Sequence, residues 1–503
     1  MTKDMTTGSP VKLILFFSIP LLIGNIFQQF YSMVDTIIVG RFLGVKALAA
    51  VGSTGSMSFL ILGFVLGLCS GFSVLISQKF GANDNEGLRE AVASSIILSV
   101  IMAIIITIIS IFTAKPLLHL MNTPNDIIND SYSYIVVIYA GTTAAFFYNM
   151  ISSILRALGD SKTPLYFLIV SSILNIILDL VFIINFKMGV AGAAYATVIA
   201  QGVAGLLCLI YTSKKFSMLK LEKKHFIAGT KHFVNHLKIG IPMALQFSIT
   251  ALGVIILQAA INAFGSNVVA AHTAASKVEQ LVMQPSITFG VTMATYCAQN
   301  LGAGNIERIK EGVKKCTMIN IAIGLISGSI LILFGEFFIK MFVSNADKSV
   351  IDTAKLYLTT VSIFFIPLSL IFVYRNTLQG MGYTFVPMMA GVYELLARTV
   401  VAFTLPAFIG YLGICMDSHS ERFCPWTRTF CVIDCDCTAC GFLSDPALRT
   451  FRNGSGAILV EKGRRTSSGG GRNYDLSAFR YKIRKTGKCF CQILRSVTNV
   501  IHL

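Results

Sequence analysis

Ionisable side chains inside long apolar stretches are the residues of this sequence that point most directly to chemistry. Asp35 interrupts the apolar stretch YSMVDTIIVG, and Asp179 interrupts a second stretch with Asn175 four residues before it. Residues four apart lie on the same face of a helix. Thr197 ends the small-residue stretch GVAGAAYAT, a composition that lets helices approach closely. These side chains together offer two carboxyl groups, an amide and a hydroxyl.

This oxygen-rich set has three interpretations. It could hold a sodium ion, or the two carboxyl groups could share one proton, because like charge and desolvation both favour the protonated form. The third interpretation is a hydrogen-bonding network between helices without a role in transport. Charged residues at membrane depth are costly and normally face a bundle interior or a water-filled cavity. We therefore predict a cation-coupling site formed by Asp35, Asn175, Asp179 and Thr197.

A second group of polar residues lies later in the chain. Glu394 and Arg398 are four residues apart, so they can pair with each other or take part in a substrate or coupling site. Gln258 and Gln284 complete this second set of candidates. Lys277 and Glu279 are two apart and do not face each other, which predicts a hydrated cavity or the outer part of a helix. Several aromatic and methionine side chains are predicted to pack or to line an adaptable apolar cavity: Phe146, Phe147, Tyr148, Met243, Met283, Phe289 and Met293.

Composition says which elements must position these residues. The chain has 503 residues, of which 54% are hydrophobic and only 13% charged, whereas a soluble domain carries about 25% charged residues. The fold class expected is therefore an all-α polytopic membrane protein with retained spans and no cleaved leader. Eleven stretches are long and apolar enough to span: 12–39, 48–76, 91–112, 131–155, 163–186, 190–212, 238–263, 268–297, 313–339, 353–379 and 385–409.

The net charge of +17 is distributed as expected for a membrane protein. If the N-terminus is cytoplasmic, we count 18 basic residues on the cytoplasmic side, Arg156 and Arg375 among them, against 7 on the outer side. This excess follows the positive-inside rule. The sequence thus predicts a multi-pass protein of the cell membrane, in contact with lipid and not with nucleic acid.

The chain contains an internal repeat. SQKFGANDNEGLREAV resembles AQNLGAGNIERIKEGV, with Gln78 and Gly81 matching Gln299 and Gly302. FSIPLLIGNIFQQF, LRALGDSKTP and GVAGAAYAT also have counterparts in the second half. Both copies start on the same side, so two pseudo-symmetric bundles of six helices are expected, as in secondary transporters. The predicted divisions are a first bundle over 1–213, a basic cytoplasmic linker over 214–237 and a second bundle over 238–416.

The repeat breaks off within its last element. From Asp417 the composition turns basic, with 7 of the 12 cysteines and the only tryptophan, and the twelfth span is missing or disrupted. A frameshift is the favoured interpretation of residues 417–503; a fusion joint and a native appended domain are the alternatives. The last would use Cys431, Cys435, Cys437 and Cys440 as a zinc site, although their spacing is not that of a zinc ribbon. Otherwise no metal or cofactor is expected, and the tail is predicted to be disordered.

The ordered combination of these features resembles the multidrug and toxic compound extrusion (MATE) transporters. The resemblance rests on the repeat, on Asp35 followed by Gly40, on Asn175 and Asp179, and on GVAGAAYAT with Thr197. It implies antiport of organic cationic drugs against H⁺ or Na⁺ by alternating access, with the first bundle binding the coupling ion. We also expect a transporter and not an enzyme, acting as a monomer. Thr250 stands where some relatives carry an acid.

The alternative is a flippase for lipid-linked oligosaccharides or polysaccharides. Such a protein would line its cavity with several basic residues for phosphate groups, and in the sequence Arg398 is nearly alone. No phosphate-cradling loop or nucleophile motif supports an enzyme. Antiport of drugs therefore remains the favoured prediction.

Overall fold

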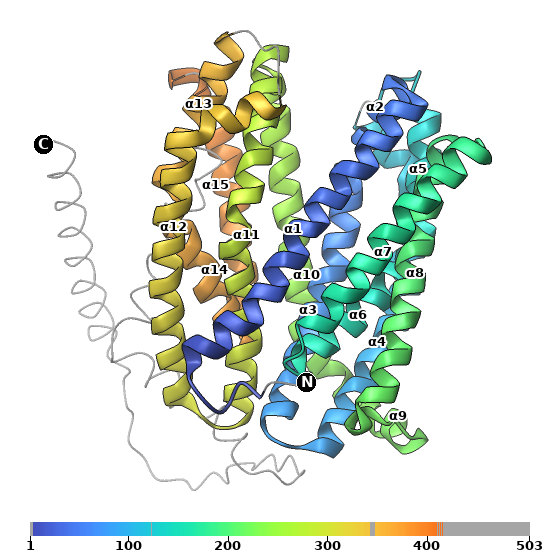
Figure 1. Ribbon diagram of the computed structural model, residues 1–503, viewed down its shortest axis with the longest axis vertical. Coiled ribbons are helices and arrows are strands. Elements are labelled where there is room, and N and C mark those ends of the chain that lie inside the picture. The colour runs from blue at the N-terminus through green and yellow to red at the C-terminus, as the bar shows by residue number, and fades with distance from the viewer. Residues whose placement is uncertain are drawn as a thin grey trace, which may run out of the picture. The chain divides into compact units, whose positions relative to one another are not determined.

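The computed structural model describes residues 4–121, 123–342 and 348–409, and positions 411, 413 and 415. The tail 417–503, with the four cysteines of the zinc alternative, lies outside these residues, and the missing twelfth span stays a prediction. The described secondary structure is entirely helical (Figure 1). The helices of the first half are α1 (Pro10–Leu43), α2 (Val45–Ser53), α3 (Gly55–Gly81), α4 (Asn85–Leu120), α5 (Ile128–Ala140), α6 (Thr142–Ala157), α7 (Lys162–Leu180), η1 (Val181–Asn185) and α8 (Gly189–Lys215).

Three short helices connect this half to the next: η2 (Ser217–Leu219), α9 (Lys223–Gly229) and η3 (Thr230–His232). The second half consists of α10 (Phe233–Asn262), α11 (Ser266–Gly302), α12 (Ile306–Phe342), α13 (Lys348–Ile363), α14 (Phe365–Gly380) and α15 (Phe385–Ile409). Each of the eleven predicted spans falls on one of these helices or on a consecutive pair. The prediction of an all-α polytopic membrane protein is confirmed.

Length and apolar composition identify the helices that can cross a membrane. Within the described residues eight helices qualify, or up to ten if each of two bent pairs counts as one span. Helix α11 is 37 residues long but is not among these. Its more polar composition has a reason, because one of its faces borders a cavity.

The two bent spans show the internal repeat at the level of structure. Helices α5 and α6 meet at Gly141 with a bend of 45°, and α13 and α14 meet at Phe364 with a bend of 54°. These two breaks are 223 positions apart, the same offset as the repeat pair Gly159 and Gly382. The repeat therefore includes a change of helix direction as well as matching residues.

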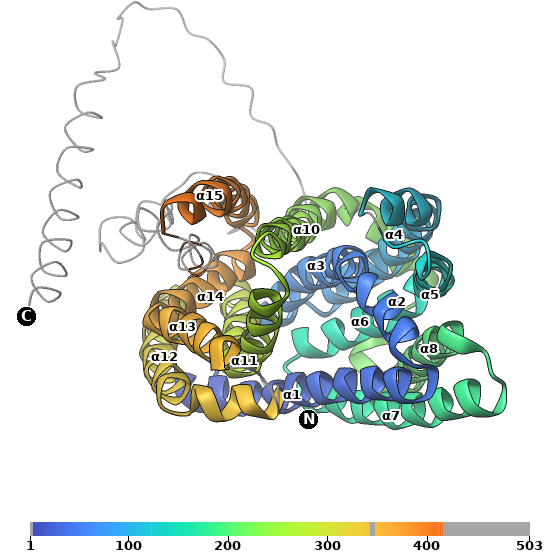
Figure 2. The ribbon, with the colours of Figure 1, turned by 90° about the horizontal axis from the view of Figure 1, so that it is seen from above.

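The first helix of each half packs against the second membrane-spanning element of the other half. Helix α10 runs beside α3, and α1 contacts both α7 and α11 (Figure 2). The contact between α3 and α10 is a backbone contact, since a Cβ on Gly67 would lie 2.5 Å from the Cα of Ala244. The contact between α1 and α11 is polar: Ser18 and Thr292 share a hydrogen bond of 2.8 Å, and Asn25 donates to Thr288 at 3.0 Å.

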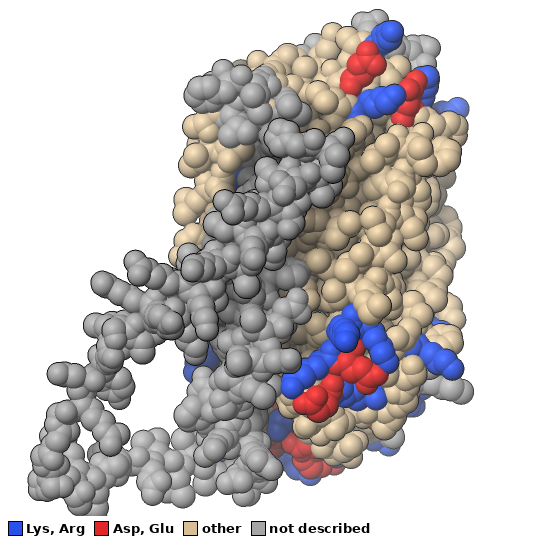
Figure 3. All heavy atoms as spheres, turned by 90° about the vertical axis from the view of Figure 1, so that its left-hand side faces the viewer, with Lys and Arg blue, Asp and Glu red and all other residues tan. Residues whose placement is uncertain are grey.

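Charged side chains on the face formed by α12 and its neighbours gather at the two ends of the helices (Figure 3). Lys310 pairs with Glu307 at one end, and Lys340 pairs with Glu336 at the other. A broad band between them carries uncharged side chains. This distribution is the one expected where a hydrocarbon layer surrounds the middle of the helices.

Candidate functional site

The first candidate site is a pair of carboxyl groups on α1 and α7. Asp179 is fully buried and Asp35 is partly buried. The two groups lie within hydrogen-bonding reach of each other, and the Oδ1 atom of each is buried with no hydrogen-bond partner among the described residues. Two carboxyl groups in contact need a proton or another cation between them, because carboxylate oxygens only accept. This pair is therefore suited to hold one positive charge.

Asn175 and Thr197 complete the arrangement that their spacing predicts. With the Asn175 amide oriented to satisfy both ends, its nitrogen donates to Asp179 Oδ2 at 2.9 Å. Its oxygen then accepts from the hydroxyl of Thr197 at 3.2 Å and from the Thr197 backbone N–H at 3.1 Å. The four predicted coupling residues thus lie together, and Asn175 ties α7 to α8.

Local backbone geometry brings α7 and α8 together beside the acids. Helix α7 ends one residue after Asp179 and continues as the π-helical turn η1, a conformation that is frequent at functional sites. Gly192 of α8 faces this turn, and a Cβ there would lie 3.2 Å from that of Phe182. The small-residue stretch before Thr197 is what permits this approach.

Two tyrosines belong to this site although the sequence analysis did not select them. Tyr31 is hydrogen-bonded to Thr197 and interacts with Asp35. Tyr134, from α5, is near both acids. Tyr31 lies four residues before Asp35, so the helical spacing applied to Asn175 would have found it. No sequence signal pointed to Tyr134, because its helix reaches the site only through tertiary packing.

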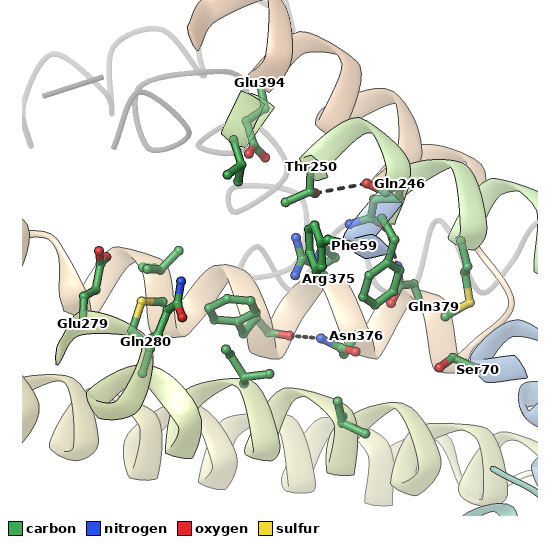
Figure 4. A pocket seen from close by; sticks show the side chains of 18 of the residues that line it. Phe59, Ser70, Gln246, Thr250, Glu279, Gln280, Arg375, Asn376, Gln379 and Glu394 are labelled. Carbon is green, nitrogen blue, oxygen red and sulfur yellow. Dashed lines mark hydrogen bonds between the residues drawn. The ribbon is translucent and has the colours of Figure 1, made fainter. Parts of the chain in front are cut away.

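The second candidate site is a cavity of about 700 Å³ bordered by α3, α6, α10, α11, α13, α14 and α15 (Figure 4). Asp35, Asn175, Asp179 and Thr197 do not line it. Glu394, Arg398 and Gln258 do, as do Lys277 and Glu279, but Gln284 does not. Of the predicted aromatic and methionine set, Met243 and Met283 line the cavity, whereas Phe146 and Met293 are buried in the core.

Glu394 and Arg398 form the pair that their spacing allows. The Arg398 guanidinium lies 3.5 Å from a carboxylate oxygen of Glu394, and both side chains are almost completely buried. Glu279 accepts a hydrogen bond of 2.7 Å from the hydroxyl of Tyr357. Thr250, the position at which the family resemblance implies an acid in some relatives, lines the cavity and donates to the carbonyl of Gln246 at 3.0 Å.

Comparison with known proteins decides the family. The MatE family model matches this chain twice, over residues 20–181 and 242–404, which together exceed half of its length. The chain belongs to the MATE family. The two matched segments also coincide with the two copies of the internal repeat.

Relatives agree with this assignment. The chain is 30% identical to the probable multidrug resistance protein YpnP of Bacillus subtilis, over 75% of this chain and 84% of that protein. It is 31% identical to YoeA of the same organism, over 71% and 79%. Among solved structures, a MOP superfamily transporter from Pyrococcus furiosus, described by the reverse polarity of its binding pocket, superimposes with a TM-score of 0.77. That match has 26% identity and covers 84% of this chain and 95% of the other. This MATE protein is thus a multi-pass efflux transporter of the multidrug class, which resides in a lipid bilayer and handles small molecules.

Two cavity residues were placed wrongly by the sequence analysis. Arg375 was counted with the cytoplasmic loops, but it lies on α14 and lines the cavity beside Gln246 and Thr250 (Figure 4). The same correction applies to Arg156, in the last turn of α6. Both lie near the end of a predicted span, where sequence alone does not separate a loop residue from a cavity residue. The excess of basic residues on the predicted cytoplasmic side survives their removal.

A symmetric backbone contact closes this MATE protein at the end that carries residues 82–84 and 303–305. A Cβ on Gly81 would lie 1.9 Å from the carbonyl oxygen of Gln299, and a Cβ on Gly302 would lie 1.9 Å from that of Gln78. The side chain of Gln299 donates to the carbonyl of Ala157 at 2.8 Å, and that of Gln78 donates to the carbonyl of Gly380 at 3.3 Å. The two repeat motifs, one from each half of the chain, therefore contact each other at this end.

Within the described residues, no three histidine, cysteine, aspartate or glutamate side chains gather as a metal site. The zinc alternative at Cys431, Cys435, Cys437 and Cys440 lies outside those residues.

Proposed function

We propose that this protein exports small organic molecules by antiport against protons, and that Asp35 and Asp179 carry the coupled proton. The observation that carries the proposal is the contact between the two carboxyl groups, each with a buried oxygen that has no partner among the described residues. Such a pair holds one proton well and loses it when the groups are separated or exposed to water. Its protonation is then tied to the conformation of the helices that carry it.

Helix α1 supplies a physical connection between the pair and the cavity. Asp35 lies in the part of α1 that packs near α7, whereas Ser18 and Asn25 of the same helix are hydrogen-bonded to α11. Residues of α11 such as Met283 line the cavity. Pro20 lies between Ser18 and Asn25 and removes a backbone hydrogen bond at a point where α1 can bend. A proton shared by Asp35 and Asp179 therefore acts on α1, and α1 is also hydrogen-bonded to α11.

The carboxyl pair and the cavity are separate sites. This separation supports coupling of proton and cargo through a conformational change and not through competition for one site. None of the four coupling residues lines the cavity, so cargo and proton do not share a contact. Alternating access explains exchange between them if each ligand binds a different conformation more tightly. The N-terminus is proposed to be cytoplasmic, since most basic residues then lie on the cytoplasmic side, and the transporter is proposed to act as a monomer.

Sodium is the second candidate for the coupled ion, because Asp35, Asp179, Asn175 and Thr197 all offer oxygen. The proton is favoured for two reasons. Two neighbouring carboxyl groups can share a proton by themselves, whereas a sodium ion needs a complete shell of oxygen ligands. The Asn175 oxygen is also already occupied by Thr197.

The test is dye export from proteoliposomes that contain the full chain. A proton gradient and a sodium gradient are imposed separately, and ATP is supplied alone in a third sample. We expect the proton gradient to drive export in the wild type, and Asp35→Asn and Asp179→Asn each to abolish it. Asp352→Asn, which changes an exposed acid of α13, is the matched control and should transport normally.

Size-exclusion chromatography and thermal unfolding verify that the two asparagine variants remain folded. Wild-type export by both variants would rule out the carboxyl pair as the coupling site. Export driven by sodium and not by protons would replace the proton with the metal ion. Export driven by ATP with both gradients collapsed would exclude antiport altogether.

A further inference from the structure

The cavity has an excess of positive charge that the sequence analysis did not predict. Four basic side chains line it, from Arg156, Lys277, Arg375 and Arg398, whereas its acids are Glu279 and Glu394. His272 also lines the cavity and is counted as neutral in this formal sum. The described lining therefore has a formal excess of two positive charges.

The acids of the cavity already have partners. Glu394 is paired with Arg398 at 3.5 Å, and Glu279 accepts a hydrogen bond from Tyr357 at 2.7 Å. In the described part of the chain, no carboxylate lies within 4.0 Å of Arg156 or Arg375. Glu394 is the acid that acts on Arg375 from further away. Within the described residues, the cavity therefore has three basic side chains without an adjacent carboxylate, Arg156, Arg375 and the exposed Lys277.

Neutral groups hold Arg375 in a fixed orientation. With the Gln246 amide turned to face it, the amide oxygen accepts from Nη1 at 3.2 Å and from Nε at 3.3 Å. The other end of that amide lies 2.6 Å from the amide of Gln379. The guanidinium also lies over the ring of Phe372, 5.0 Å from its centroid. A guanidinium held by an amide and an aromatic ring keeps its full charge and its remaining N–H groups for a ligand.

Arg156 contributes charge from the other half of the chain. Its Nη2 atom donates to the hydroxyl of Ser153 at 2.8 Å, a neutral partner that also lines the cavity. Two arginines without an adjacent carboxylate, one from α6 and one from α14, thus face a common space. Leaving such charges away from bulk water without a counter-charge is unfavourable, so the cavity favours an anionic occupant.

The rest of the lining is apolar and aromatic. Phe59, Phe247, Met283 and Phe372 border the same cavity, and its volume of about 700 Å³ is within the range of about 300–1,000 Å³ that small-molecule sites occupy. Methionine side chains adapt to ligands of different shape. The lining therefore combines a basic site with an apolar surface that tolerates variation.

We propose that the cargo of this cavity is an amphiphilic organic anion, an aromatic or aliphatic body with one carboxylate or phosphate group that binds Arg375. This inference rests on the proposed function, since it names the cargo of the same transporter. It replaces the organic cation implied by the family resemblance, and it removes the objection raised against a flippase, that Arg398 stood nearly alone as a basic residue of the cavity. The acidic group binds the guanidinium, and the apolar body lies against the phenylalanine and methionine side chains.

The test measures equilibrium binding to the purified full chain in detergent micelles by calorimetry, with a micelle-only titration subtracted. The probes are three molecules with one shared body: 1-pyrenebutanoate, its methyl ester and 4-(1-pyrenyl)butylammonium. We expect the carboxylate to bind at least about tenfold more tightly than the ammonium compound. Arg375→Gln should lower the affinity for the carboxylate about tenfold and leave that for the ester unchanged, whereas Arg375→Lys should retain part of the preference.

Arg41→Gln is the matched control, because Arg41 is exposed at the end of α1 and does not line the cavity. It should bind all three probes like the wild type. If the Arg375→Gln variant elutes as an aggregate, the same binding measurements are made with Arg156→Gln, which removes the arginine that the first half contributes to the cavity. Equal or tighter binding of the ammonium compound, or wild-type affinity of the folded Arg375→Gln variant for the carboxylate, would overturn the proposal.

A competition arm separates a soluble cargo from a lipid one. Displacement of 1-pyrenebutanoate by phosphatidic acid supports the same anion site with a lipid able to present the acidic group. Binding of phosphatidic acid without any binding of 1-pyrenebutanoate would refute the small soluble anion. The binding test does not depend on proton coupling. A preference for anions would persist even if the carboxyl pair had no role in export. Proton-driven export would persist even if the cavity showed no preference for anions.

Discussion

Replacement of Gly81 by alanine tests whether the symmetric contact holds one end of the transporter closed. The added Cβ would lie 1.9 Å from the carbonyl oxygen of Gln299. Non-bonded carbon and oxygen atoms stay more than about 3 Å apart, so α3 and α11 would have to separate by about 1 Å or more. The oxygen belongs to the backbone, and no side-chain rotation can relieve the overlap.

Overpacking of this kind costs about 1–3 kcal/mol. The cost falls only on the conformation in which Gly81 and Gln299 touch, because a conformation open at this end lacks the contact. With a cost of about 2 kcal/mol, the population ratio shifts about 30-fold toward the open conformation. Gly302→Ala should have the same effect, since its Cβ would lie 1.9 Å from the carbonyl oxygen of Gln78.

Hydrogen–deuterium exchange measured by mass spectrometry is the assay, on peptides that cover residues 78–84 and 299–305. Exchange of these amides should become faster in both variants, since opening exposes them to water. Gly52→Ala is the control: its Cβ meets nothing within 4 Å, and a helical alanine in place of glycine should stabilise α2 by about 0.5–1 kcal/mol. Unchanged exchange over 78–84 in a folded Gly81→Ala variant would refute the idea that this contact holds the end closed.

Two further variants test local interactions. Glu394→Gln should destabilise the protein by about 3 kcal/mol, measured by thermal unfolding, because it leaves the buried charge of Arg398 without its carboxylate; unchanged stability would contradict the pairing. Asp84→Ala should cost about 1 kcal/mol, because the Asp84 side chain accepts from the N–H of Gly87 and caps α4. Partial burial raises the pKa of Asp84, but its bonds to Lys79 and Gly87 outweigh this and lower the pKa overall. Its stabilising effect should therefore be complete at neutral pH and disappear as the pH falls through that lowered pKa, and a difference from the variant that grew on acidification would contradict this sign.

Much of the fold follows from patterns that the membrane imposes on the sequence. A span must be long and apolar, so the eleven stretches could be delimited from composition, and each falls on a helix or a helix pair. An acid inside a span is costly and therefore conspicuous, which is why Asp35 and Asp179 were selected first. Asn175 and Thr197 followed from helical spacing and from the small-residue stretch beside them.

Tertiary structure decided the features that depend on which helices meet. Sequence spacing said nothing of Tyr134, which reaches the acids from α5, or of the bends at Gly141 and Phe364. The repeat showed that Gln78 and Gly81 correspond to Gln299 and Gly302, but only the folded chain brings these residues into contact.

The charge of the cavity shows where sequence reasoning fails and why. An arginine near the end of a predicted span has the same sequence appearance whether it faces cytoplasm or a cavity, so Arg156 and Arg375 were both assigned to loops. Their environment depends on the neighbouring helices, since Gln246 and Phe372 orient Arg375 and no carboxylate stands beside it within the described residues. The sequence by itself determined that this protein spans a membrane, resembles a transporter family and carries two acids within the spans of its first half. Packing decided that its cavity is basic, because the electrostatics of a cavity depend on side chains that only the tertiary structure brings together.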